Sequence, residues 1–255
     1  MKIQVKEGWF VGKEFDGSDG WMDGESRGLF YSFLSAVFND EVSVAKIADF
    51  LRPENSGQLE KSLELIPEDK SARLQEGIKE LKQRWGGHLG DEEKENLDLR
   101  REFAYLFLTP HGVNPYESIY RGKKKLLMDK PWEEVRNFYR SIGIEKDKSQ
   151  MHPEDHIAVE LGLMATLAYM SGRFLLEAND TELMEEERKD ILKAQYSFLE
   201  QHLSKWVPQF CNDIAEKARH PFYRSVAELT AEFVRADLSC LQDYFTNDKF
   251  TEEGR

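Results

Sequence analysis

Two short segments hold the residues of this chain whose types and spacing could do chemistry. The first runs from Asn114 to Tyr120 (NPYESIY) and combines a proline with aromatic rings, a carboxylate and hydroxyls. The second runs from His152 to His156 (HPEDH) and combines imidazoles with carboxylates. One amphipathic helix is predicted between them. We therefore expect the rest of the chain to be a scaffold that brings the two segments together.

The HPEDH segment has the composition of a helix start. Pro153 suits the first helical position, which predicts that Glu154 and Asp155 lie in the first turn. Carboxylates are favoured there by unpaired amide donors and by the helix dipole. His156 and Glu160 would then lie one turn apart on the same face. Two interpretations stay open: these groups bind a cationic or hydrogen-bonding ligand, or they fasten neighbouring loops to the helix start.

A metal-dependent hydrolase is the alternative function that this segment raises. His152, His156 and Glu160 stand at i, i+4 and i+8, together with Asp155, and such side chains bind transition metals. However, His152 precedes a proline and is pushed out of helical geometry, so the three are not expected to share a face. No HExxH motif accompanies them. We therefore predict no metal and no cofactor, and keep the hydrolase only as the alternative.

The NPYESIY segment is short, aromatic and proline-led. It offers an aromatic wall, a carboxylate and a hydroxyl beside an apolar groove, which suits an extended or helical apolar peptide. In the other interpretation its tyrosines plug a groove between two helical halves. The lysine-rich stretch after Arg121 is expected to be a solvated basic loop.

Other chemistries lack support in the sequence. No GxSxG motif occurs, and neither Cys211 nor Cys240 has a histidine in a suggestive context. The two cysteines stand far apart without CxxC spacing, which predicts free, buried thiols of a reducing compartment. No Gly-rich Walker loop occurs either. A nucleotide such as GTP is left open as a ligand.

The chain is acidic, with 48 Asp and Glu against 35 Lys and Arg and a formal net charge of −13. This balance repels nucleic acid and anionic membrane surfaces, because phosphate neutralisation drives binding there. It favours encounter with a basic partner, although acidity also serves solubility alone. No apolar run is long enough to cross a bilayer, and the N-terminus does not have the pattern of a signal peptide. We therefore expect a cytoplasmic protein without stable membrane insertion.

Apolar residues recur at helical spacing from Glu25 onward, and after Gly24 no segment alternates with period two for more than a few residues. The chain is therefore predicted to be all-α. Pro153 is expected to open the longest helix, and Pro208 is expected to precede a short one. Helices are predicted to begin near Glu25, Val44, Leu59, Leu74, Asp91, Pro131, Pro153, Ile191, Phe210 and Pro221.

The prolines and glycine between residues 109 and 115 mark a boundary between two helical halves. The predicted organisation is a partly ordered N-terminal extension (1–24), an N-terminal half (25–108), a linker with the motif loop (109–130), a C-terminal half (131–246) and a tail (247–255) that frays from Thr246. We expect a monomer, with a domain-swapped dimer through the linker as the alternative.

In this order and separation, the two segments resemble the TorD/DmsD/NarJ family of cytoplasmic chaperones for molybdenum-containing oxidoreductases. The resemblance covers roughly residues 25–244. The residues that carry it are Tyr105-Leu106-Phe107, Thr109-Pro110-His111-Gly112, Pro115-Tyr116-Glu117-Ser118-Ile119-Tyr120, Pro153-Glu154-Asp155-His156-Ile157 with Glu160-Leu161, and a His-Leu-x-x-Trp segment beginning at His202.

The resemblance implies a TorD-like multi-helix bundle and a non-enzymatic chaperone. Its partners would be the twin-arginine signal peptide and the catalytic subunit of a molybdopterin oxidoreductase, held back from export until the cofactor is inserted. Asp155, Glu117 and Glu154 would meet the basic part of the peptide. The predicted peptide-binding residues are Phe107, Pro115, Tyr116, Glu117, Ser118, Tyr120, Glu154, Asp155, His156 and Glu160.

Overall fold

The computed structural model describes residues 24–64, 68–87, 91–146, 149–176 and 181–252. Almost all of the predicted extension, 1–24, therefore lies outside the described residues. Within those ranges the regular structure is helical apart from one isolated β-bridge, which confirms the all-α prediction. The helices are α1 (Gly24–Asn39), α2 (Val44–Phe50), α3 (Pro53–Glu64), α4 (Glu68–Trp85), α5 (Glu92–Phe107), α6 (Glu117–Arg121), α7 (Lys130–Ser141), α8 (Ile157–Leu176), α9 (Thr181–Phe198), a π-helical turn (Leu199–Leu203), α10 (Ser204–Lys217) and α11 (Pro221–Glu252).

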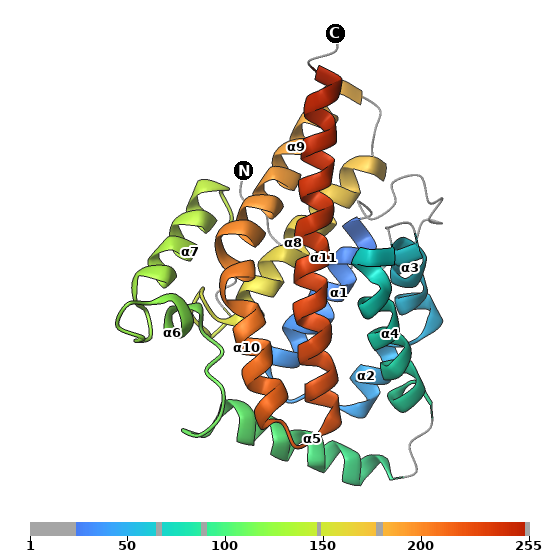
Figure 1. Ribbon diagram of the computed structural model, residues 1–255, viewed down its shortest axis with the longest axis vertical. Helices are drawn as coiled ribbons and strands as arrows, with labels where there is room; N and C mark the ends of the chain where they lie inside the picture. The colour runs from blue at the N-terminus through green and yellow to red at the C-terminus, as the bar shows by residue number, and fades with distance from the viewer. Residues whose placement is uncertain (1–23, 65–67, 88–90, 147–148, 177–180, 253–255) are drawn as a thin grey trace.

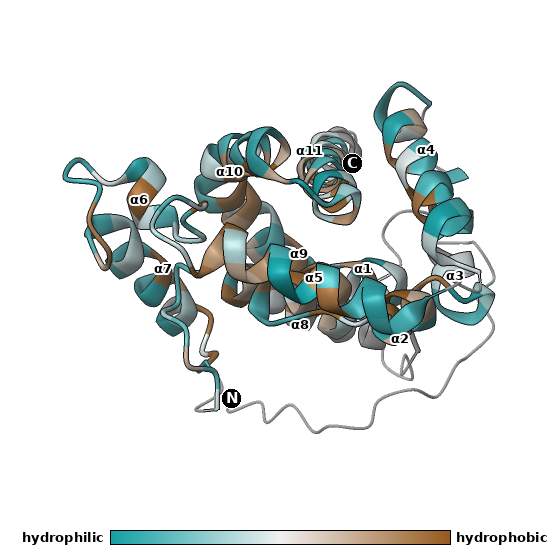
Figure 2. Cartoon of the chain, turned by 90° about the horizontal axis from the view of Figure 1, so that it is seen from below, coloured by the Kyte–Doolittle hydropathy of each residue, from teal (hydrophilic) through white to brown (hydrophobic). Residues whose placement is uncertain are grey.

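The long helix α11 runs down the middle of the view in Figure 1, and the view from below in Figure 2 shows it between α10 and α4. It packs against α10 on one side and α4 on the other, while α1 lies along α8 and α9 packs beside α8. The buried apolar residues form one continuous core to which α1, α8 and α11 all contribute. Helices on both sides of the 109–130 segment thus share a core, and the division into two halves stays a prediction. None of the described helices has the length and apolarity to span a membrane.

Local sequence signals account for several helix boundaries. The predicted stripe Leu74, Ile78, Leu81 and Trp85 is buried along one face of α4. Asp91 caps α5 by accepting a hydrogen bond from the Lys94 amide at 3.0 Å, which satisfies one of the orphan donors of a helix start. These elements follow from residues within a few positions of each other.

The start of α8 differs from the prediction. Pro153 does not open the helix, which begins four residues later at Ile157. The reason is non-local: the Ile157 amide donates to the Pro115 carbonyl at 2.9 Å, and the Glu117 amide donates to the Asp155 carbonyl at 2.8 Å. The backbone before Ile157 is therefore paired with the first segment instead of forming a helical turn.

Three further boundaries differ. The NPYESIY segment is not only a loop, because Glu117–Arg121 forms the short helix α6. Pro208 lies inside α10, where burial of Trp206 and Phe210 outweighs the one helical hydrogen bond that a proline removes. The longest helix is α11 and not α8, and it continues past Thr246 to Glu252.

A buried ion pair ties α1 to α11. The Arg27 guanidinium contacts Asp237 at 2.7 and 2.9 Å and donates to the Gln195 side chain of α9, while the Tyr31 hydroxyl donates to Asp237 at 2.6 Å. Both charged side chains are fully buried. Within the protein interior, each charge is compensated by the other members of this network.

We predict that Asp237→Ala lowers the free energy of unfolding by about 3–5 kcal/mol, because it leaves Arg27 buried without its counter-ion. Asp243→Ala is the matched control on the same helix, since Asp243 is 57% exposed in its ion pair with Lys70; the expected loss there is below about 1 kcal/mol. Urea unfolding of both variants measures this. Equal losses would contradict the role given to the buried pair.

Candidate functional site

The two predicted segments lie against each other. Tyr116 and His156 form an isolated antiparallel β-bridge through the two backbone hydrogen bonds described above. The Asp155 side chain then accepts a hydrogen bond from the Ser118 amide at 3.1 Å. Asp155 thereby satisfies an amide at the start of α6. Its pKa is raised by burial, and hydrogen bonds from Ser118 oppose that shift.

Two glutamates meet beneath this bridge. Glu117 is fully buried, forms an ion pair with Arg121 and lies 3.0 Å from His202 Nδ1. Glu160 is also fully buried and accepts from Trp206 Nε1 at 3.0 Å, and its charge interacts with that of Glu117. Burial, followed by the nearby Glu117, raises the pKa of Glu160 well above its ordinary value. A proton on Glu160 removes one of the two negative charges from this buried pair.

His156 acts as a neutral hydrogen-bond acceptor. Its Nδ1 accepts from the Ala158 amide at 3.1 Å in the first turn of α8. Its ring stacks on His152 with centroids 3.9 Å apart and meets the Tyr116 ring edge-on at 5.0 Å. Burial, together with the neighbouring His152, lowers the pKa of His156 to about 3. The imidazole is therefore uncharged near neutral pH.

Four of the ten predicted residues, Phe107, Tyr116, Tyr120 and Glu154, retain partial exposure. The Tyr120 hydroxyl donates to Asp213 of α10 at 3.0 Å, and its ring packs on Trp206. Glu154 accepts a hydrogen bond from Trp132 of α7.

Phe107 lies at the edge of the same region, where its ring contacts Phe210 of α10. Tyr120 contacts the ring of Phe210 as well, so Phe210 connects Phe107 to the motif segments. The other six predicted residues, Pro115, Glu117, Ser118, Asp155, His156 and Glu160, are buried. All ten predicted residues thus belong to one region of the fold.

Sequence reasoning missed His202 and Trp206 as partners of the two glutamates. Both belong to the His-Leu-x-x-Trp segment, and their i, i+4 spacing was the available signal, because it favours a shared helix face. The π-helical turn precedes α10 and ends next to His202, at Leu203. These residues link α6 and α8 to α10.

The geometry gives no support to the hydrolase alternative. The described part of the chain contains no group of three or more His, Cys, Asp or Glu side chains that could hold a metal ion. His156 Nδ1 accepts a hydrogen bond from the Ala158 amide, and Glu160 accepts one from Trp206 and lies near Glu117. The three proposed ligands do not converge.

We predict that Glu160→Gln stabilises the protein at alkaline pH. The folded-state pKa of Glu160 lies above its unfolded value near 4.5, so its contribution is full below about pH 4.5 and is lost as the pH rises toward the folded-state pKa. Glutamine stays neutral and still accepts from Trp206. The expected gain at pH 8 is about 1 kcal/mol or more, since one pKa unit corresponds to about 1.4 kcal/mol.

Thermal unfolding of wild type and variant between pH 4 and 9 measures this gain. Glu95→Gln is the matched control, because Glu95 also accepts from a tryptophan, Trp85, but is partly exposed. Parallel stability curves for wild type and Glu160→Gln would contradict the assignment of the proton.

Comparison with known proteins matches residues 68–212 to the family described as nitrate reductase delta subunit. Chaperone protein TorD of Photobacterium profundum is 31% identical over 221 residues, which are 85% of this chain and 94% of the relative. Chaperone protein TorD of Vibrio atlanticus is 31% identical over 85% of this chain and 95% of its own length. Chaperone protein TorD of Vibrio cholerae El Tor is 29% identical over 87% of this chain and 94% of its own length. With its family match over more than half of its length, this chain belongs to the nitrate reductase delta subunit family.

Proposed function

We propose that this protein is the chaperone of one molybdenum-cofactor oxidoreductase, and that it binds the twin-arginine signal peptide of that enzyme's catalytic subunit. The coarser statement, a chaperone for molybdoenzyme maturation, follows from the family and the TorD relatives. The observation that carries the proposal is that the family match over 68–212 spans both motif segments. Binding of the peptide would delay export until the cofactor is inserted, which assigns the complex to the cytoplasm.

Charge supports a basic ligand. The chain carries a net charge of −13, and opposite charge speeds encounter and selects against acidic partners. A signal peptide with an arginine pair followed by an apolar stretch has the matching chemistry. The role requires no catalytic step, so we propose a binding protein and not an enzyme.

We keep the ten predicted residues as part of the peptide-binding region and divide their roles. The buried members, including Glu117, Asp155 and Glu160, already have hydrogen-bond partners within the protein. They position α6, the start of α8 and α10. Phe107, Tyr116, Tyr120 and Glu154 remain partly exposed. Among these, we propose that Tyr116 and Glu154 contact the peptide.

Isothermal calorimetry tests the function with the twin-arginine signal peptide of the oxidoreductase encoded beside this gene. We expect saturable binding to wild type that weakens at least about tenfold when both peptide arginines become glutamines, because each loses a charge-assisted contact. No binding of the native peptide would contradict the proposed function.

The same assay tests the residue assignment. Tyr116→Ala is expected to weaken binding about three- to tenfold, since loss of an aromatic contact costs about 1 kcal/mol. Tyr196→Ala on α9 is the matched control, because Tyr196 is also a partly exposed tyrosine. Unchanged affinity in Tyr116→Ala would remove this residue from the peptide-binding surface and leave the function standing.

A further inference from the structure

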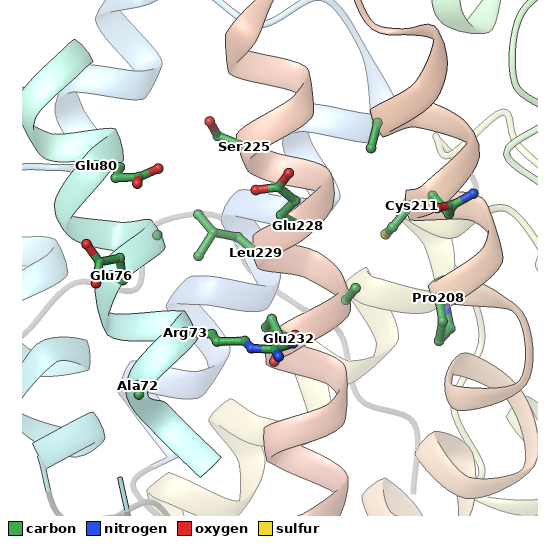
Figure 3. A pocket seen from close by; sticks show the side chains of 14 residues that line it. Ala72, Arg73, Glu76, Glu80, Pro208, Cys211, Ser225, Glu228, Leu229 and Glu232 are labelled. Carbon is green, nitrogen blue, oxygen red and sulfur yellow. Dashed lines mark hydrogen bonds and ion pairs between the residues drawn. The ribbon is translucent and has the colours of Figure 1, made fainter. Parts of the chain in front are cut away.

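A second candidate binding feature lies on the other side of α10 from the motif segments. It is a groove of about 630 Å³ between α4, α10 and α11. Figure 3 views it closely: Glu76 and Glu80 belong to α4, Glu228 to α11 and Cys211 to α10. A smaller pocket beside Trp85 shares Glu80 and Ser225 with it. The groove therefore extends along α4 from Arg73 toward Trp85, which is roughly 18 Å at 1.5 Å per helical residue.

The floor of the groove is apolar. Its lining includes Pro208, Cys211, Ala215, Leu229 and Ala231. Gly77 brings α4 close to α11, because a Cβ atom at this position would lie 2.6 Å from Leu229 Cδ2. A glycine inside a helix costs about 1 kcal/mol relative to alanine, and here it leaves room for the Leu229 side chain.

The larger pocket is lined by four carboxylates and one cation, and the smaller pocket adds a second cation, Arg84. The cation of the larger pocket, Arg73, pairs with Glu232 at 3.1 Å, and Glu232 also accepts from Arg235. Glu76, Glu80 and Glu228 have no ion pair among the described residues. Glu80 and Glu228 point into the space between α4 and α11 (Figure 3).

Glu76, Glu80 and Glu228 are exposed and repel one another weakly in the free protein. Glu76 and Glu80 are one turn apart on α4, and like charges at this spacing destabilise a helix by a few tenths of a kcal/mol. Glu228 adds a third negative charge from the facing helix. A cationic ligand would relieve this repulsion. Guanidinium fits best, because its planar fork binds carboxylates in pairs and is less strongly hydrated than an ammonium group.

We propose that this groove binds the arginine pair of the signal peptide, with the first apolar residues after the pair lying on the floor. The inference rests on the proposed function and gives the basic part of the peptide a location separate from the buried motif carboxylates. The carboxylates of the groove would bind the arginine pair, and the apolar floor would contact the apolar residues that follow it. The motif segments contribute indirectly, because Trp206 and Asp213 anchor α10 to Glu160 and Tyr120.

The test is calorimetry with the same signal peptide and a triple variant, Glu76→Gln, Glu80→Gln and Glu228→Gln. We expect its affinity to fall about tenfold or more, since three carboxylate contacts are lost. The charge-matched control is Glu145→Gln, Glu186→Gln and Glu187→Gln, which changes three exposed glutamates elsewhere. The control is expected to bind within about twofold of wild type.

A second variant tests contact independently of charge. Ala215→Trp fills the groove from α10, where Ala215 is partly exposed, and it is expected to weaken binding of the native peptide by a similar factor. Circular dichroism verifies that each variant is folded.

The outcomes separate the inference from the function on which it rests. If wild type binds the peptide in an arginine-dependent way and the groove variants bind as well as the control, the groove assignment is overturned and the function stands. If an arginine-free apolar peptide competes equally, the groove is not an arginine site. If wild type does not bind the peptide at all, both proposals fall.

Discussion

The backbone pairing between Pro115–Glu117 and Asp155–Ile157 is the constraint on which the site depends. Two hydrogen bonds hold segments that are about forty residues apart in the chain. They hold α6 against the start of α8. They also place Glu117 and Glu160 near each other in the protein interior. Burial of two carboxyl groups is tolerated only because one proton, Arg121, His202 and Trp206 compensate them.

This cluster also fixes α10. Glu160 accepts from Trp206, Glu117 contacts His202, and Tyr120 donates to Asp213. These residues belong to α10 or to the π-helical turn before it. The same helix forms one wall of the groove between α4, α10 and α11. A shift of α10 would therefore affect both the motif segments and the groove. In our proposal the buried part of the motif sets the shape of the binding region, while the charges that attract the peptide lie at the surface of α4 and α11.

Much of the fold follows from local sequence signals. The buried stripe of α4 and the cap at Asp91 were predictable because the residues involved are near neighbours in sequence. The start of α8 was not predictable from Pro153, because its backbone is paired with a distant segment. Pro208 inside α10 was missed for a related reason, since tertiary packing of Trp206 and Phe210 outweighs a local helix-breaking tendency.

The sequence predicted which residues lie together in the site better than it predicted which of them are buried. All ten residues lie in one region, yet nothing in the spacing of Glu117 and Glu160 reveals that they face each other, because that contact depends on the packing of α6 on α8. The acidic groove has no sequence signature at all: Glu76 and Glu80 resemble a solvated helix face until α11 supplies Glu228 opposite them.

Photo-crosslinking tests the central claim most directly. A signal peptide with a photoreactive residue next to the arginine pair is bound, irradiated and digested, and the crosslinked fragments are identified by mass spectrometry. Our account predicts crosslinks to residues 73–80 of α4 and 225–232 of α11. Specific crosslinks confined to other surfaces, such as α7, would contradict it.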